Sequence, residues 1–319
     1  MKHLEDTPWW ICDPEDTNYC SYVDTDSNYF HAEPILRYLY PNFDKMSDNE
    51  RDDALEGIAK EYEKIITNNY DVLAKKVFNI NKFPWFKDMK KDHWLEMKTE
   101  CVIRSAYFRA TRRYAQWITK QEGIEKEDVD IKGLEFKKAN FPPRLGKFFK
   151  KVLVDVLKGA KQPEIDRRVK EFKNQIFDGT IPLSDLGSPT SVKKLNKYSG
   201  RKARAGEMFS PIEKGAPAAV KATIVYNDLI KFWGLSKDYS YIVQGDKIRW
   251  VWLKPNPYQI DSIAFQSFDI PKKIRTFIEE YIDRNKIFNG TLLNKLDGFY
   301  SDLGWSLSLN PYKQKLFNL

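Results

Sequence analysis

The sequence predicts an α+β protein, because stretches with strand periodicity alternate with long amphipathic helices. Apolar residues recur at helical spacing over residues 48–78, 145–157 and 165–176. Residues 94–118 instead approximate a period of two, which is typical of half-buried strands, and residues 19–30 place strand-favouring residues on both sides of a turn. This mixture predicts antiparallel sheets packed with helices rather than an all-helical bundle.

The first strand pair is predicted as a hairpin with two carboxylates at its turn. Tyr22 and Val23 lead into Asp24-Thr25-Asp26, and Asn28 and Tyr29 lead out of it. The turn brings Asp24 and Asp26 close together, and such a pair repels itself unless a cation lies between the carboxylates. Carboxylate oxygens are ligands that Mg²⁺ prefers. A solvated Asx turn explains the same letters, so the motif alone leaves both interpretations open.

The helices that follow have recognisable starts. Ser47 is a predicted N-cap for the helix of residues 48–78. Later helices are predicted after Pro143, from about Pro163 and over residues 216–233, and a late helix contains Ile274 and Phe277. Their apolar stripes are expected to be packing residues.

A second β-hairpin is predicted near the C-terminal end of the chain. Gly245-Asp246 separates the apolar runs 239–243 and 248–253, a pattern that favours a tight turn between two strands.

Composition indicates a folded chain with a polyanionic partner. Hydrophobic residues make up 42% and charged residues 31% of the 319 residues, and the formal net charge is +8. The three cysteines show no zinc-site or disulfide spacing, which favours a reducing compartment. No apolar run reaches the length of a membrane span and no signal peptide opens the chain, so we expect a soluble cytoplasmic protein without a membrane partner.

The segment Tyr22 to Ser27 reads Tyr-Val-Asp-Thr-Asp-Ser and resembles the Tyr-Gly-Asp-Thr-Asp-Ser signature of family B DNA polymerases. In that family the motif carries metal-binding aspartates of the palm. Val23 replaces the usual glycine, and both carboxylates are kept. The resemblance implies that Asp26 is the main metal ligand from this chain and that Asp24 is auxiliary.

Further segments resemble the family in the same order along the chain. Met97-Lys98-Thr99-Glu100 is similar to a palm strand of the T-even-like phage replicative polymerases, which implies a catalytic place for Glu100 near the metals. Arg112-Arg113-Tyr114-Ala115 resembles the basic-Tyr segment whose residues contact the primer strand, with Arg112 where the family prefers lysine. Asp130 to Glu135 resembles the Lys-x-Gly-Leu-Glu segment that leads from palm to thumb.

The resemblance implies two domains. Residues 1–139 would form the C-terminal portion of a palm, an antiparallel sheet with packed helices. Residues 140–319 would form a mostly helical thumb with a β-hairpin insertion and a C-terminal tail. The turn Gly245-Asp246-Lys247 and the segment Leu292 to Phe299 resemble parts of the phage thumb.

Basic residues accompany these motifs and are predicted to contact primer–template DNA. The segment 188–204 interleaves cations with short hydroxyl residues and glycine, which suits phosphate contacts that carry no sequence information. A plain basic surface loop is the alternative for this segment. The predicted DNA-binding residues are Arg112, Arg113, Tyr114, Lys132, Lys137, Lys138, Lys193, Lys194, Lys197, Arg201, Lys202 and Arg204.

The tail is similar in position and character to the sliding-clamp-binding tail of the T-even-like phage polymerases. Its predicted anchors are Leu316, Phe317 and Leu319. Docking of this apolar tail on the chain's own body explains it equally well.

The family's exonuclease domain, first palm aspartate and fingers helix all precede this hairpin, and none is found in the sequence. The resemblance therefore implies the C-terminal subunit of a split, phage-type DNA polymerase, located in the bacterial host cytoplasm. An N-terminal partner subunit would supply the exonuclease, the remaining palm and the fingers, and two Mg²⁺ ions would be shared between the chains. We expect this chain alone to bind DNA without polymerase activity.

Two other function classes remain open. A catalytically silent DNA-binding or scaffold subunit would tolerate Val23 and Arg112, although the kept Asp24, Asp26 and Glu100 argue against it. An Asp-x-Asp metal-dependent sugar-nucleotide transferase would need a parallel βα domain before the turn, and only 23 residues precede Asp24.

Overall fold

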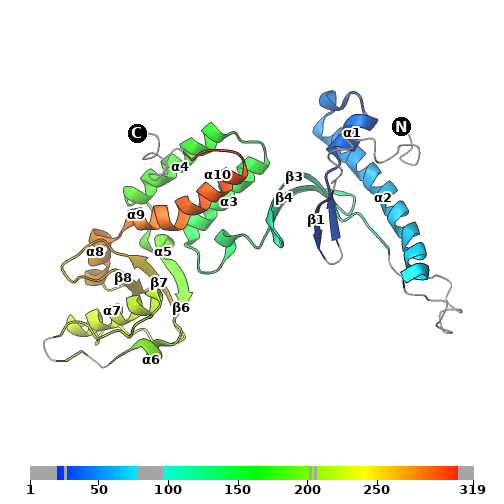
Figure 1. Ribbon diagram of the computed structural model, residues 1–319. Helices are drawn as coiled ribbons and strands as arrows, with labels where there is room; N and C mark the ends of the chain where they lie inside the picture. The colour runs from blue at the N-terminus through cyan, green and yellow to red at the C-terminus, as the bar shows by residue number, and fades with distance from the viewer. Residues whose placement is uncertain (1–19, 25–26, 78–95, 201–202, 205–206, 308–319) are drawn as a thin grey trace, which may run out of the picture. The chain divides into compact units, whose positions relative to one another are not determined.

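The computed structural model describes residues 20–24, 27–77, 96–200, 203–204 and 207–307. They form helices and antiparallel sheets, so the predicted α+β class is confirmed (Figure 1). Contacts within the chain divide it into two compact units, one ending at Gly133 and the other starting at Leu134. The predicted palm–thumb boundary followed residue 139, whereas the observed division falls where strand β5 ends.

Unit 1 begins with a hairpin and a small helical layer. Strands β1 and β2 pair antiparallel, and two short helices lead to the long helix α2. The bounds are β1 Cys20–Asp24, β2 Ser27–Phe30, α1 Glu33–Leu39, η2 Phe43–Lys45 and α2 Asp48–Val77. The predicted helix over residues 48–78 is thus confirmed.

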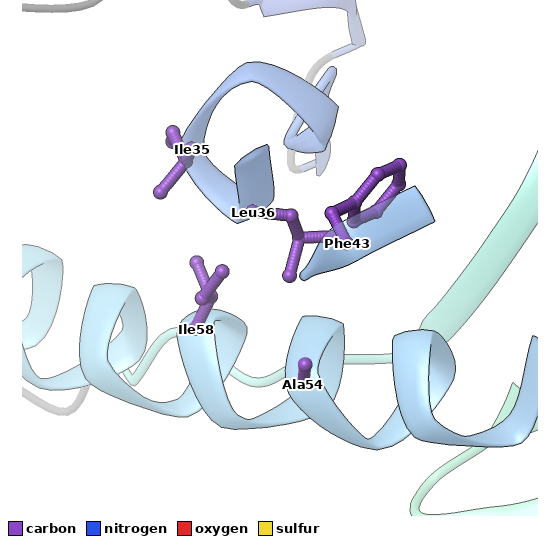
Figure 2. Packing of buried hydrophobic residues seen from close by; sticks show 5 residues of the cluster. All are labelled: Ile35, Leu36, Phe43, Ala54 and Ile58. Carbon is purple, nitrogen blue, oxygen red and sulfur yellow. The ribbon is translucent and has the colours of Figure 1, made fainter. Parts of the chain in front are cut away.

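A compact apolar cluster holds α1 and η2 on α2. Figure 2 shows its buried side chains, which come from all three elements: Ile35, Leu36, Phe43, Ala54 and Ile58. Ser47 starts α2 as predicted, through a capping box in which the Glu50 backbone N–H donates to the Ser47 hydroxyl at 3.3 Å. The Glu50 carboxylate accepts from the Ser47 backbone N–H at 2.7 Å. The sequence therefore fixes the point where α2 begins.

The second part of unit 1 is a three-stranded antiparallel sheet in the order β3-β4-β5. Its strands are β3 Cys101–Ala110, β4 Arg113–Gln121 and β5 Ile124–Lys132. Strand structure was predicted from residue 94 to 118, but residues 96–100 have no regular secondary structure. In this part the alternation of the sequence does not correspond to a strand, and β3 begins only at Cys101.

Ion pairs connect α2 to the sheet. The Arg104 guanidinium contacts Asp48 at 2.9 Å and Asp52 at 2.5 Å. Lys120, almost buried, pairs with Glu56 at 3.0 Å and also with Asp53. The acidic face of α2 thus contacts cations of two neighbouring strands.

Unit 2 is mostly helical around one small sheet. Its elements are η5 Glu135–Lys137, α3 Pro143–Leu157, α4 Gln162–Phe177, α5 Leu183–Leu186, β6 Ser188–Ser191, α6 Leu195–Tyr198, α7 Ala218–Phe232, β7 Lys247–Trp252, β8 Ser262–Phe265, α8 Lys272–Tyr281, α9 Arg284–Lys286, the π-helix η6 Ile287–Leu293 and α10 Asn294–Asp302. The predicted helices after Pro143, near Pro163 and over residues 216–233 are confirmed, as is the late helix. The predicted apolar stripes are buried packing residues, with Leu145 and Ile165 fully buried.

The predicted hairpin over residues 239–253 is wrong. Strand β7 pairs with β6 on one side and β8 on the other, in the order β6-β7-β8. The run 239–243 is not a strand, because the side chain of Asn227 binds both the N–H and the carbonyl of Ile242 at 2.8 Å. Among the helices of the described residues, none is long and apolar enough to span a membrane.

Candidate functional site

The β1–β2 hairpin carries the predicted metal-binding turn. Tyr22 pairs with Tyr29 and Asp24 with Ser27, which leaves a two-residue connection between the strands. Asp24 is therefore the last residue of β1, two positions beyond Tyr22. Its side chain and the whole of Asp26 lie outside the described residues, so their predicted metal-binding role stays a prediction.

Four aromatic side chains hold this hairpin on the sheet of unit 1. Tyr22 and Tyr29 contribute from the hairpin, Phe108 from β3 and Tyr114 from β4, with all ring centroids 5.4 to 6.0 Å apart. The Tyr22 and Phe108 rings are stacked, with 17° between their planes. Burial raises the pKa of Tyr29, and its side-chain hydrogen bond to Tyr114 raises that pKa further. The hairpin is thus packed against an aromatic platform.

The same platform reaches the turn between β3 and β4. The backbone N–H of Arg112 donates to the Tyr22 hydroxyl at 2.9 Å. Arg112 has a φ of 59°, which places it in the left-handed region. This hydrogen bond connects the hairpin motif directly to the basic-Tyr motif.

Gly133 approaches Arg112 from the end of β5. A Cβ atom on Gly133 would lie 2.0 Å from the Arg112 carbonyl oxygen, and the φ of Gly133 is 62°. Only glycine fits a position with both properties. Tyr22, Arg112 and Gly133, which we call the Arg112 junction, thus join three predicted motifs from distant parts of the sequence.

Two carboxylates lie near this platform. Glu100 is exposed and its carbonyl accepts from the Glu122 backbone N–H at 2.8 Å. Asp130 of β5 pairs with Lys132 at 3.4 Å. Burial raises the pKa of Cys101 to about 11, and the charges of Glu100 and Asp130 add to this shift. The charges of Asp130 and Glu100 also raise the pKa of Lys132, Asp130 being the largest cause.

The predicted primer-contacting residues differ in exposure. Arg112 and Arg113 are exposed, while Tyr114 is only 9% exposed within the aromatic platform. Lys132 is exposed beside Asp130. The arginines can therefore meet a large ligand directly, whereas Tyr114 acts through packing and its bond to Tyr29.

A cavity of about 570 Å³ lies between the hairpin, α2 and the start of β3. Apolar side chains such as Ile58 and Ile103 line it together with Glu63 and Glu100. Glu63 is engaged by the backbone N–H of Thr99. This cavity therefore brings Glu100 beside apolar surface of the hairpin layer.

No group of three or more His, Cys, Asp or Glu side chains suited to a metal ion occurs among the described residues. Glu100 is thus not part of a complete metal site built from that portion of the chain. A Mg²⁺ site that includes Glu100 would need the carboxylates of the hairpin turn and donors from elsewhere.

The predicted DNA-binding cations of unit 2 are exposed where they are described. They lie on η5 and around α6, with Lys194 at a φ of 56° before α6 and Lys197 over the Tyr198 ring at 5.4 Å. The exposed cations are Lys137, Lys138, Lys193, Lys194, Lys197 and Arg204. The remaining predicted contacts, Arg201 and Lys202, and the tail anchors Leu316, Phe317 and Leu319, lie outside the described residues.

Several residues at the site were not singled out from the sequence. Tyr29 and Phe108 complete the platform, and Asp130 adds a carboxylate next to Lys132. The alternation Asp128-x-Asp130-x-Lys132 was a usable signal for Asp130, since it places the three side chains on one face of a strand. Phe108 carried no such signal, because it reads as one more apolar strand residue.

No protein-family model matches the chain, and no curated protein matches it.

Proposed function

We propose that this chain is the C-terminal subunit of a split, phage-type family B DNA polymerase, active together with a partner subunit. The observation that carries the proposal is the Arg112 junction. Three segments chosen by resemblance, around residues 22, 112 and 133, meet within one hydrogen bond and one backbone contact. The pairing of β4 with β5 already brings residues 112 and 133 together, so the proposal rests on the hydrogen bond that joins them to the hairpin of Tyr22, 90 residues earlier in the chain.

In this proposal the hairpin turn holds the metal ions. Asp26 would be the main ligand, Asp24 auxiliary and Glu100 a nearby carboxylate, with the partner subunit supplying the remaining donors. Oxygen donors of this kind fit Mg²⁺. Bound Mg²⁺ would lower the pKa of the primer 3′-hydroxyl and neutralise charge on the departing pyrophosphate.

The chain's own residues would position the primer. The exposed Arg112 side chain would contact the primer backbone, and the hydrogen bond from its backbone to Tyr22 would fix its distance from the hairpin. Tyr114, packed beneath, would keep Tyr22 in place. Holding reacting groups at a fixed separation is a large part of catalysis of phosphoryl transfer.

The exposed cations of unit 2 would hold the duplex backbone. Lys193, Lys194 and Lys197 lie on and beside a short helix with neighbouring hydroxyl residues, a pattern suited to phosphate contacts. Such binding falls steeply with salt and does not depend on base sequence.

Primer extension by the complex that co-purifies with this chain tests the proposal. We expect the wild-type complex to extend a primer and the Asp26→Asn complex to lose extension by at least about a hundredfold while still binding duplex DNA. Asp238→Asn, the same chemical change at an exposed aspartate of unit 2, is the control and should extend normally.

Equal extension by the wild-type and Asp26→Asn complexes would exclude Asp26 as a ligand and favour the silent scaffold. Duplex binding without any extension by the assembled wild-type complex would contradict the polymerase proposal itself.

A further inference from the structure

A second cavity, of about 400 Å³, lies wholly within unit 2. It is enclosed by the loop before α5, by the connection from β8 to α8, and by α8 and α9, all of which are labelled or can be followed in Figure 1. Its apolar walls include Ile181 and Ile270. Its polar lining consists of Ser184, Ser267, Arg275, Glu279 and Arg284.

Arg284 brings a buried donor to this cavity without a partner. Its Nε atom is buried and has no hydrogen-bond partner among the described residues. The N-cap Asp283 fixes the start of α9 by accepting from the Lys286 backbone N–H at 2.9 Å. Gly179, at a φ of 82°, lies against the guanidinium, since its Cβ would be 3.6 Å from an Arg284 terminal nitrogen. A buried donor on a cation is costly to leave unsatisfied, so the described residues leave this guanidinium short of hydrogen-bond partners.

The cavity also has an excess of positive charge. Within the described part of the chain, no carboxylate lies within 4.0 Å of the Arg275 or Arg284 guanidinium. The charge of Arg284 also acts on Asp178, but the Asp178 carboxylate lies more than 4.0 Å away. That carboxylate accepts a hydrogen bond from the Thr180 backbone N–H at 2.9 Å. Glu279, one turn beyond Arg275 on α8, supplies the opposing charge in the lining. The lining therefore carries two guanidinium groups and one carboxylate.

The two serines supply neutral donors. The Ser267 hydroxyl oxygen accepts from Arg249 Nε at 2.8 Å, which leaves its own proton available for donation. Ser184 lines the same cavity from α5, and its hydroxyl makes no hydrogen bond to a described residue. Planar guanidinium forks together with hydroxyl donors are the groups that bind phosphate oxygens most strongly.

We propose that this cavity binds a phosphate group through Arg275, Arg284, Ser184 and Ser267. A terminal phosphate suits this cavity better than a phosphodiester within a duplex, because a terminal group can enter it end-on while Arg275 at its rim stays exposed. The source is either the phosphorylated end of a nucleic acid or a small phosphate ester. This site stands independently of the polymerase proposal, whose residues it does not include.

Calorimetric titration of the full chain with inorganic phosphate, at fixed ionic strength, tests the site. We expect Arg284→Gln and Arg275→Gln each to weaken binding by at least about tenfold, since each removes a charge-assisted hydrogen bond. Glu279→Gln should tighten binding by removing the opposing charge. Lys272→Gln is the matched control, because it removes an exposed cation from the start of the same helix outside this cavity, and it should change binding less than twofold.

Absence of phosphate binding by the wild-type chain would overturn the proposal, as would an equal loss in Lys272→Gln. Circular dichroism checks the fold of each variant, and the exposed Arg275 and Glu279 keep the test decisive if Arg284→Gln does not fold.

A second titration distinguishes the sources. An oligonucleotide with a 5′-phosphate is compared with the same oligonucleotide with a 5′-hydroxyl and with a nucleoside monophosphate, each against wild type and Arg275→Gln. An arginine-dependent preference for the phosphorylated oligonucleotide assigns a nucleic-acid end, and equal binding of the monophosphate assigns a small phosphate ester. Failure of both phosphorylated probes to show an arginine-dependent effect refutes the site.

Discussion

Gly133→Ala is the substitution that tests the Arg112 junction most directly. The added Cβ would lie 2.0 Å from the Arg112 carbonyl oxygen, so two backbone segments would have to separate by about 1 Å to reach the shortest contact that real Cβ atoms make. The positive φ costs an L-residue about 1–2 kcal/mol, and overpacking against backbone typically costs a further ~1–3 kcal/mol. We therefore expect a loss of about 3 kcal/mol in the stability of unit 1.

Gly123→Ala is the matched control for this prediction. Gly123 also lies in unit 1 with a positive φ, of 78°, but its Cβ would meet only a Glu56 carboxylate oxygen, at 3.3 Å, which a small side-chain shift relieves. It should cost about 1 kcal/mol, from backbone strain alone.

Amide hydrogen exchange of β3, β4 and β5 measures this difference, with α3 and α4 of unit 2 as an internal reference. A difference of about 2 kcal/mol corresponds to about thirtyfold faster exchange in Gly133→Ala than in Gly123→Ala. Equal exchange in the two variants would refute the close approach of Gly133 to Arg112.

Three further predictions concern unit 1. Tyr22→Phe keeps the stacked ring but removes the acceptor of the Arg112 backbone N–H. We therefore expect unit 1 to lose about 1 kcal/mol of stability and the Arg112 amide hydrogen to exchange faster. Unchanged exchange of that amide would contradict the hydrogen bond. Because the pKa of Cys101 is raised to about 11, its thiolate fraction at pH 8 should be about a hundredfold below that of an ordinary cysteine. With the other two cysteines replaced by serine, alkylation should be correspondingly slow and should speed up in Glu100→Gln; a rate unaffected by that change would place Glu100 elsewhere. Hydrogen bonds from lysine side chains lower the pKa of Glu56, so its stabilising effect is present above its unfolded pKa of about 4.5 and is lost as the pH falls through its lower folded pKa. Glu56→Gln should therefore flatten the acid side of a stability profile followed by circular dichroism, and an unchanged slope would exclude this contribution.

The helices were predictable because their information is local. The stripes of α3 and α4 repeat within the helix itself, and Pro143 and Ser47 mark helix starts through the chemistry of their own side chains or rings. The apolar run 248–253 also identified β7, although it was predicted as one half of a hairpin with residues 239–243.

Strand pairing was not local, and the failed hairpin shows why. β7 pairs with Ser188–Ser191, a stretch with proline and three small hydroxyl residues that carries no strand signal of its own. The nearer run 239–243 has the stronger strand pattern, yet the Asn227 side-chain amide is hydrogen-bonded to both the backbone N–H and the carbonyl of Ile242. A sequence pattern states that a segment is extended but not which segment it will pair with.

The same limit applies to the candidate site: its motifs were predictable from the sequence, and the contacts between them were not. Resemblance in order along the chain selected Tyr22, Arg112 and Gly133's segment, but spacing gave no reason for them to touch. The positive φ of Arg112 and the lack of a side chain at Gly133 permit the contact. The glycine is visible in the sequence, but the φ of Arg112 and the closeness of the two residues are known only from the fold.

The way the hairpin is held bears on how such a site would work. Within the described strands, β1 pairs only with β2, so the outer edges of this two-stranded sheet bind no third strand. A two-stranded hairpin is marginal by itself, and here the aromatic platform and the hydrogen bond to Arg112 stabilise it. Val23 remains 58% exposed on that hairpin, next to the predicted metal-binding turn. An open strand edge with an exposed apolar residue is where another chain adds strands most readily. In the proposed function, a partner subunit would add its strands at this edge, beside the hairpin turn.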